Sequence, residues 1–274
     1  MAKRKAANLK EVESAAVDAS PRWLLLTYEP VSLFSLRSTY SMSKGGKTLL
    51  LPTPYAVKMA FIDACFRFAN ADSGDQHARE MFDRIKGRQI RFRPPTECVV
   101  QNTFVKIRQD ERDGESGFYV PTIAYRELVF FTGLLTIAIN AKEWSSDEAS
   151  LVANAAAHVN YFGKRGSFFQ FLQSEVVDEL PPMFSISGND SVTSIPTSTY
   201  GVTQFLDDFG PDLCAAKDGF ERISTYHNKD IKIGKHRMLV LTLVPYQRKE
   251  ASKSFTRYVC HPLQIEITGE TFHS

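Results

Sequence analysis

Apolar residues recur along the chain at two spacings, and each spacing predicts its own set of elements. Apolar runs at residues 23–28 and 126–139 are typical of buried strands. Residues 88–93 alternate basic and apolar side chains, which predicts a strand with one cationic face. Residues 97–108 and 118–125 also have strand character and flank a polar turn, so residues 94–125 are expected to form a protruding hairpin insert.

Helical spacing appears after Pro54, where Pro52 and Pro54 mark a helix start and Thr53 is placed to cap it. The apolar stripe of this helix runs to Phe68. A second helix is expected over residues 75–86, and a capping box at residues 145–148 predicts a third, whose apolar face extends to residue 159. A further strand is expected to follow and to end near residue 177.

The order strand, helix, strand, strand, helix, strand, with one hairpin inserted, predicts an α+β fold of the ferredoxin-like plan. We expect a flexible N-terminal arm over residues 1–21, a main domain over residues 22–180, and a β-rich C-terminal extension over residues 181–274. The extension contains a long Ser/Thr-rich loop at residues 185–203 and a basic hairpin tip at residues 247–257.

Composition narrows the function classes without choosing one. The 274 residues are 43% hydrophobic, which is enough for a sizeable core, and the net charge is only +2, so any nucleic-acid surface must be local. Four widely spaced cysteines suit a reducing cytosol, and the six histidines show no metal spacing. We expect a cytoplasmic protein with no signal peptide, membrane span, metal or cofactor.

A loop over residues 35–47, whose basic part is residues 37–47, is the first candidate site. Its Gly46-Lys47-Thr48 resembles part of a P-loop, but Ser41 stands where that motif requires glycine, so ATP binding is rejected. Cations, hydroxyl groups and flexible glycine backbone suit contact with phosphates, and Tyr40 offers a ring on which a base can stack. The alternative is an ordinary solvated surface loop.

A second basic loop, at residues 163–167, follows the third predicted helix and is expected to lie beside the first. A glycine C-cap with cations at a helix end explains Gly163 and Lys164, while ligand binding would also use Arg165 and Ser167. On the hairpin, Gln101 and Asn102 are candidates to reach across a single strand of nucleic acid, together with Lys106, Arg108 and, beyond them, Arg126.

Three segments in this order resemble the Cas five family (RAMP superfamily) of CRISPR surveillance complexes. They are Leu-Arg-Ser at residues 36–38 followed by Leu-Pro-Thr-Pro-Tyr-Ala-Val-Lys at 51–58, Arg-Glu-Leu at 126–128, and Tyr-Phe-Gly-Lys-Arg-Gly-Ser-Phe at 161–168. The resemblance covers roughly residues 22–177. It implies an RRM-related ferredoxin-like domain whose hairpin acts as a thumb and flips or intercalates a base.

The resemblance also implies a function: binding the 5′ handle of CRISPR RNA within a type I Cascade complex. The partners would be a Cas seven family backbone subunit, a Cas eight family large subunit and, near the PAM, target DNA. Residues that would contact the handle are Arg37, Ser38, Lys44, Lys47, Lys58, Arg126 and 163–167.

Two other functions stay open at this point. One is a metal-independent endoribonuclease, for which Tyr226, His227 and Lys229 stand close together, as do residues 235–237. No catalytic set carries over from the family, so a non-catalytic binder is favoured. The other is a protein-only scaffold subunit. The role of residues 181–274 and the subtype of the system are not given by the sequence.

Overall fold

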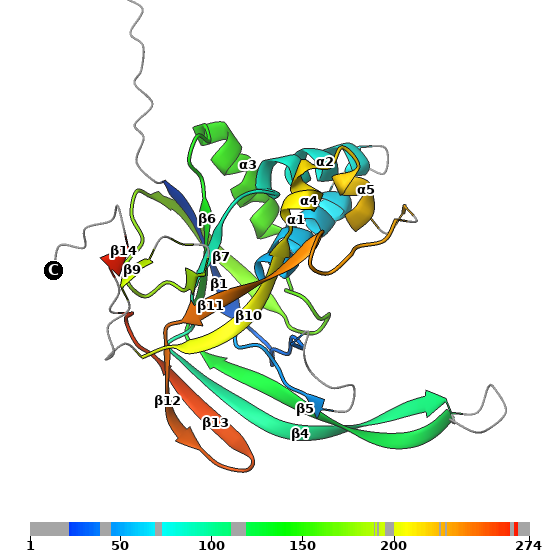
Figure 1. Cartoon of the computed structure of the whole chain (residues 1–274), viewed down its shortest axis with the longest axis vertical. Coiled ribbons are helices and arrows are strands. Elements are labelled where there is room, and N and C mark those ends of the chain that lie inside the picture. The colour runs from blue at the N-terminus through cyan, green and yellow to red at the C-terminus, as the bar shows by residue number, and fades with distance from the viewer. Residues whose placement is uncertain are drawn as a thin grey trace, which may run out of the picture.

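The computed structural model describes residues 22–38, 45–68, 73–110, 119–188, 190, 192–194, 200–224, 226–227, 229–263 and 266–267 (Figure 1). The expected N-terminal arm, residues 1–21, lies outside them. The described part mixes helices with mainly antiparallel sheets and contains more strand than helix, which confirms the mixed fold class.

A four-stranded sheet organises the molecule. Its order is β3 (Ile90–Arg93), β6 (Leu135–Asn140), β1 (Trp23–Pro30) and β7 (Phe169–Val177), and all neighbours are antiparallel. β1 is central and pairs with β6 from Trp23 opposite Asn140 to Tyr28 opposite Leu135. Because β1 is flanked on both sides, nearly all of its residues are buried. Its C-terminal end delivers the chain directly into the first basic loop.

Three helices, α1 (Pro54–Phe68), α2 (Gly74–Ile85) and α3 (Ser146–Ala157), gather on one side of this sheet (Figure 1). Leu24 and Leu26 of β1 share one apolar core with Phe61 of α1 and Val152 of α3. The proline start of α1 is where the sequence predicts it. The predicted capping box is also confirmed, since the Ser145 and Glu148 side chains each bond the other's backbone N–H.

The hairpin consists of β4 (Glu97–Asp110) and β5 (Tyr119–Thr132), which pair along their whole length. The expected single strand over residues 126–139 is wrong, because the chain turns at Gly133 and divides that run between β5 and β6. Gly133 has φ +94°, and a β-carbon there would lie 2.8 Å from Thr96 Oγ1, so only glycine fits this turn without strain.

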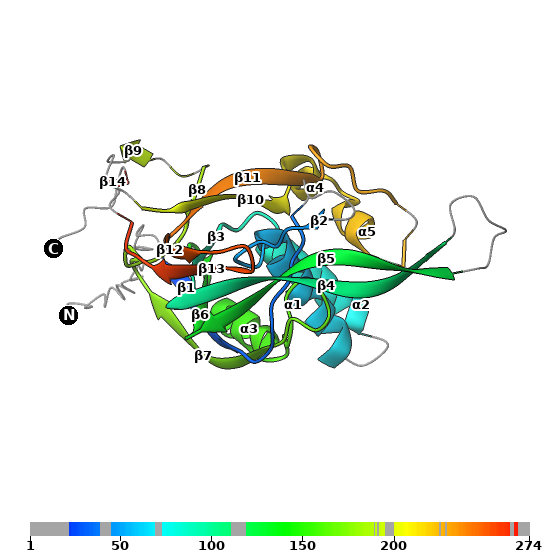
Figure 2. The same cartoon turned by 90° about the horizontal axis from the view of Figure 1, so that it is seen from below.

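A second sheet carries the hairpin. Its order is β12 (Tyr246–Ala251), β13 (Phe255–Cys260), β4, β5 and β2 (Gly45–Gly46). β13 pairs with β4 only from Glu97 to Gln101, so the outer part of the hairpin extends past the helices (Figure 2). The hairpin tip expected at residues 247–257 is wrong in its bounds, because most of these residues belong to the paired strands β12 and β13 and only residues 252–254 connect them. Strand β13 supports the base of β4.

The C-terminal extension also builds a third sheet, in which β11 (Arg237–Val244) lies between β10 (Val202–Phe209) and β8 (Ile186–Ser187). Short helices α4 (Pro211–Ala215) and α5 (Gly219–Ile223) connect β10 to β11, and β9 (Val192–Ser194) pairs with β14 (Glu266–Ile267). β10 packs beside α1. Strand β10 and both short helices were not predicted from the sequence.

Candidate nucleic-acid interface

The first basic loop is anchored along the second strand of the hairpin. Phe34 and Val129 exchange two backbone hydrogen bonds, each 2.8 Å long. Beyond them, the Ser38 N–H donates to the Lys47 carbonyl at 3.1 Å, and the Leu49 N–H donates to the Leu36 carbonyl at 2.8 Å. The two ends of the loop therefore run side by side as an antiparallel stem. Arg37 and Lys47 lie on this stem with exposed side chains.

Glu127 of β5 stabilises this stem through two hydrogen bonds. Its carboxylate accepts the Thr48 N–H at 2.8 Å, and its backbone carbonyl accepts the Ser35 hydroxyl at 3.2 Å. The backbone is closely packed nearby, since a β-carbon on Gly46 would lie 3.0 Å from Cδ of Arg126 and would require that side chain to shift. Arg126 is a candidate from the sequence, whereas Glu127 is assigned no role there. Nothing in the sequence indicates that the Glu127 carboxylate lies opposite a backbone N–H of the loop.

The second basic loop packs directly against the first. The Ser32 hydroxyl donates to the Gly166 carbonyl at 2.8 Å, and the Ser35 N–H donates to the Ser167 hydroxyl at 3.1 Å. Gly163 sits against Leu36. The predicted pairing of the two loops is therefore confirmed. Ser32 and Ser35, which join them, were not singled out, because serines in a polar stretch carry no distinguishing pattern.

Two residues predicted to contact RNA, Lys58 and Ser167, are buried and make contacts within the protein. Lys58 is 1% exposed, and its ammonium group donates to Asp208 Oδ1 at 2.7 Å and to the Lys86 carbonyl at 3.1 Å. The expectation that Lys58 faces RNA is wrong, because helix α1 turns it toward β10. Ser167 is 2% exposed and is used to position Ser35, so it orders the loop from inside.

The remaining predicted loop cations lie near one junction. Lys164 and Arg165 are exposed on the second loop, and Arg126 is half-buried beside β2. Tyr40 and Lys44 lie outside the described residues. Exposed cations on two adjacent loops can create a local positive field even though the chain as a whole is almost neutral.

The two hairpin residues predicted to contact RNA, Gln101 and Asn102, have different surroundings. Asn102 donates from its backbone N–H to the Ser254 carbonyl at 2.7 Å and from its side-chain amide to the Lys253 carbonyl at 2.9 Å, so it clamps the β12–β13 tip. Gln101 is exposed. Further out, Phe104 stands opposite Tyr125, and the two rings are 60% and 67% exposed. This exposed aromatic pair was missed, because apolar residues in a strand are normally read as core.

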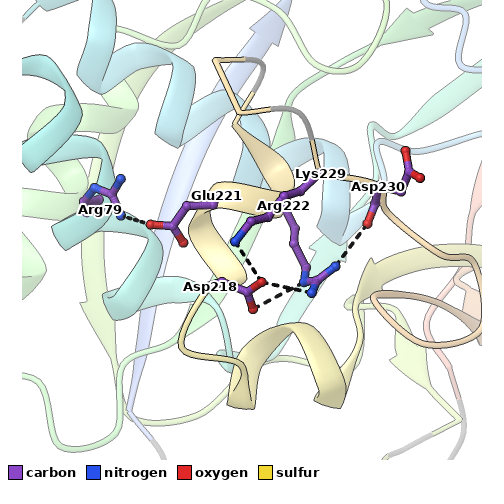
Figure 3. Close-up of polar contacts among 6 residues, drawn as sticks. All are labelled: Arg79, Asp218, Glu221, Arg222, Lys229 and Asp230. Carbon is purple, nitrogen blue, oxygen red and sulfur yellow. Dashed lines mark hydrogen bonds and ion pairs between the residues drawn. The ribbon is translucent and has the colours of Figure 1, made fainter.

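The residues considered for ribonuclease chemistry follow helix α5 and lead up to β11. The Lys229 ammonium group pairs with Asp218 at 3.0 Å, and Arg222 pairs with the same carboxylate at 2.9 Å (Figure 3). His236 accepts the Lys232 N–H at 3.1 Å through Nδ1. Lys229 and His236 therefore have polar partners, whereas Nδ1 of His227 is buried without a hydrogen-bond partner among the described residues and Tyr226 is 78% exposed.

Two classes of site are not found in the described part of the chain. No group of three or more His, Cys, Asp or Glu residues there is placed to hold a metal ion. Among its helices, none is both long enough and apolar enough to cross a bilayer.

Comparisons with known proteins give one significant sequence relative. No model of a known protein family matches the chain. CRISPR-associated protein Cas5 of Archaeoglobus fulgidus is 23% identical over 212 residues, in a match that covers 76% of this chain and 86% of that protein.

Similar solved structures share little sequence with the chain. A CRISPR protein from Archaeoglobus fulgidus aligns with 91% of this chain and 97% of its own, at 12% identity and a TM-score of 0.39. A chain of a CRISPR RNA-guided surveillance complex aligns over 81% and 90%, at 16% identity and a TM-score of 0.38. TM-scores this low do not by themselves establish a shared fold. The sequence match agrees with the resemblance to the Cas five family: the chain is similar to the CRISPR-associated protein Cas5 over 76% of its length.

Proposed function

We propose that the chain is a non-catalytic subunit of a CRISPR RNA-guided surveillance complex of the Cascade type and that it holds the 5′ handle of the CRISPR RNA. The observation that carries the proposal is the joined pair of basic loops. Ser32, just before the first loop, and Ser35, within it, bond to the second loop, which brings together two basic segments that are more than a hundred residues apart in sequence. A preassembled cationic surface can bind phosphates without first ordering a flexible segment.

The four-stranded sheet supports assignment of the ferredoxin-like plan to the main domain. Numbering its strands by their order in the chain, the spatial order β3-β6-β1-β7 is second, third, first and fourth, with every pair antiparallel. Helix α1 and helix α3 occupy the two crossover connections. In this arrangement both basic loops emerge at the same end of the sheet, because one follows β1 and the other precedes its antiparallel neighbour β7.

The hairpin is proposed to act as the thumb. Phe104 and Tyr125 form an exposed cross-strand pair beyond the point where β13 stops supporting β4. Lys106 and Arg108 lie further along the same strand. Aromatic rings beside cations suit single-stranded RNA, because bases stack on the rings while cations contact the backbone.

The remaining surfaces are proposed to meet protein. A net charge of only +2 suits a subunit embedded in an assembly better than a free RNA-binding protein. The proposed neighbours are a Cas seven family backbone subunit and a Cas eight family large subunit, with target DNA near the PAM as a further contact. Location in the cytoplasm follows from this role and is part of the proposal.

Charge reversal on the second loop tests the proposal. A tagged chain with Lys164→Glu and Arg165→Glu is expressed in cells that carry the CRISPR array and partner subunits, and the RNA that co-purifies is measured. The matched control carries Lys142→Glu and Lys217→Glu, which change the net charge equally at two exposed lysines outside both loops. We expect RNA to be lost from the first variant and kept by the control.

The same purification separates the alternatives. Unchanged RNA in the loop variant would contradict handle binding at this surface. A wild-type complex that contains no nucleic acid would favour the protein-only scaffold. Discrete cleavage of repeat RNA by the purified chain in EDTA would establish the endoribonuclease instead.

A further inference from the structure

A cavity of about 400 Å³ opens where the two basic loops meet helix α1. This volume lies within the range of pockets that hold small ligands, about 300–1,000 Å³. The walls come from four parts of the chain: the first loop, helix α1, the second loop and the start of β11. Residues that define its shape are Leu36, Tyr55, Met59, Tyr161, Gly163 and Arg237.

One wall is formed by a guanidinium group that lies over an aromatic ring. The Arg237 Cζ atom lies 4.4 Å from the centroid of the Tyr55 ring, and that ring packs edge-to-face on Phe209 at 5.2 Å. Arg237 Nε pairs with Asp207, whose carboxylate is almost completely buried. The pairing fixes the orientation of the guanidinium group and leaves its two terminal nitrogens for another partner.

The opposite side of the cavity differs in chemistry. Leu36 and Met59 provide apolar surface, and Tyr161 adds a second ring. Asp63 stands further along α1, with Oδ2 accepting the Arg67 Nε–H at 3.0 Å and a side chain that is 45% exposed. The cavity therefore offers flat apolar walls, a fixed double donor and an acceptor.

We propose that this cavity takes one unstacked purine base of the bound RNA and prefers guanine. The proposal rests on the proposed RNA-binding function and names the base-reading part of the same surface. A flat base would stack between the apolar walls, as splayed RNA bases do on aromatic and guanidinium planes. Phosphates on either side would remain within reach of the basic loops, because Leu36 and Gly163 belong both to the loops and to the cavity wall.

The preference for guanine follows from the donors and acceptors. A guanidinium group can donate two hydrogen bonds to O6 and N7 of guanine, whereas adenine presents an amino donor in place of O6. The second oxygen of Asp63 can accept from the N1–H and amino group of guanine, which adenine also lacks in that position. A good bidentate pair is worth about a tenfold difference in affinity or more.

Binding of short RNAs to the full chain tests this. The probes are three uridine heptamers whose central position is guanosine, adenosine or an abasic site. Met59→Trp fills the cavity without altering any charge, and Leu151→Trp on an exposed position of α3 is its control. Arg237→Lys retains the positive charge but loses the paired N–H donors of the guanidinium group. Thermal unfolding of each variant checks that it is folded.

We expect the wild type and Leu151→Trp to bind the guanosine heptamer about tenfold more tightly than the other two. Met59→Trp should bind all three equally, at the abasic level, and Arg237→Lys should lose the distinction between guanosine and adenosine. Equal binding of all three heptamers by the wild type would overturn the cavity proposal and leave the proposed function standing. A wild type that binds none of them, with no RNA in the purified complex, would overturn both. A guanosine preference that survives Met59→Trp would place the base elsewhere and overturn the proposal.

Discussion

Gly163 and Leu36 touch so closely that a β-carbon on Gly163 would lie 2.7 Å from Leu36 Cδ1. Gly163 also has φ +71°, which non-glycine residues rarely adopt. The contact joins the two basic loops at their apolar base, below the cations. The contact between the loops therefore requires that residue 163 has no β-carbon and that its backbone adopts a positive φ.

Gly163→Ala should separate the loops and weaken RNA binding. Gly166→Ala is a suitable control, because Gly166 also has a positive φ of +107° but nothing lies within 4 Å of the position of its β-carbon. Backbone strain of about 1–2 kcal/mol applies to both variants, while the clash applies only to the first. RNA affinity and thermal unfolding should both fall further for Gly163→Ala. Equal losses would mean that the contact with Leu36 is unimportant.

Glu127 should position the first loop through one hydrogen bond. Glu127→Ala removes the acceptor of the Thr48 N–H, whereas Glu127→Gln keeps an oxygen there. Both changes remove the same negative charge, so the difference between them isolates the hydrogen bond, worth about 1 kcal/mol. We expect Glu127→Gln to bind RNA more tightly than Glu127→Ala. Titrations at two salt concentrations measure this, and identical affinities would contradict it.

Lys58 should matter for stability and have no direct part in RNA binding. Lys58→Met leaves the Asp208 carboxylate, whose pKa burial already raises, without its cation. Breaking such a buried pair costs about 3 kcal/mol of unfolding free energy. Adding Asp208→Asn should recover part of this loss, since the uncompensated charge is removed. Chemical denaturation measures both variants, and the salt dependence of RNA binding should be unchanged.

The exposed rings of the hairpin should affect binding alone. Phe104→Ala with Tyr125→Ala removes two rings that pack little in the free chain, so thermal unfolding should shift only slightly. If bases stack on these rings, affinity for single-stranded RNA should fall by about 1–3 kcal/mol per stacked base. Thr122→Ala, on the other face of β5, is a control. Unchanged affinity in the double variant would remove the hairpin from the interface.

Acid should loosen the attachment of α5 to α2. The Arg79 side chain donates to Glu221 at 2.5 Å and holds the pKa of that carboxyl below its usual value (Figure 3). A lowered folded-state pKa contributes stability above the unfolded value, about 4.3, and this contribution is lost as pH falls through the folded value. Glu221→Gln should therefore lose less thermal stability than wild type between about pH 6 and pH 3. Parallel loss in both proteins would contradict the assignment.

The helices of the main domain could be predicted because the patterns that define them lie within a few neighbouring residues. Pro54 and the apolar stripe define α1, and the Ser145–Glu148 pair defines the start of α3. Gly133 was misjudged because a single glycine in an apolar run does not reveal that the chain changes sheets there. Strand β10 was missed because Asp207 and Asp208 interrupt its apolar pattern, and only the structure shows that Arg237 and Lys58 pair with them.

The candidate interface divides in the same way. Residue type alone marked the two basic loops and the exposed cations Arg37, Lys164 and Arg165. It could not separate Lys58 from them, because burial of a lysine depends on a partner 150 residues away. Ser32 and Ser35 contact the second loop, and Glu127 connects the first loop to β5. Such contacts between distant segments have no signature in a single sequence.

Asn102 marks the point along β4 beyond which the hairpin is no longer supported by β13. Up to Asn102, strand β4 has partners on both sides, while from Thr103 outward it pairs, within the described part of the chain, with β5 alone. The eight residues from Thr103 to Asp110 thus form a cantilever about 25 Å long, with its fulcrum at the Asn102 clamp on residues 253 and 254. Residues 253 and 254, from the C-terminal extension, therefore support β4 on one side of the hairpin while β2 supports β5 on the other, so segments from both ends of the chain fix the direction in which the hairpin leaves the body.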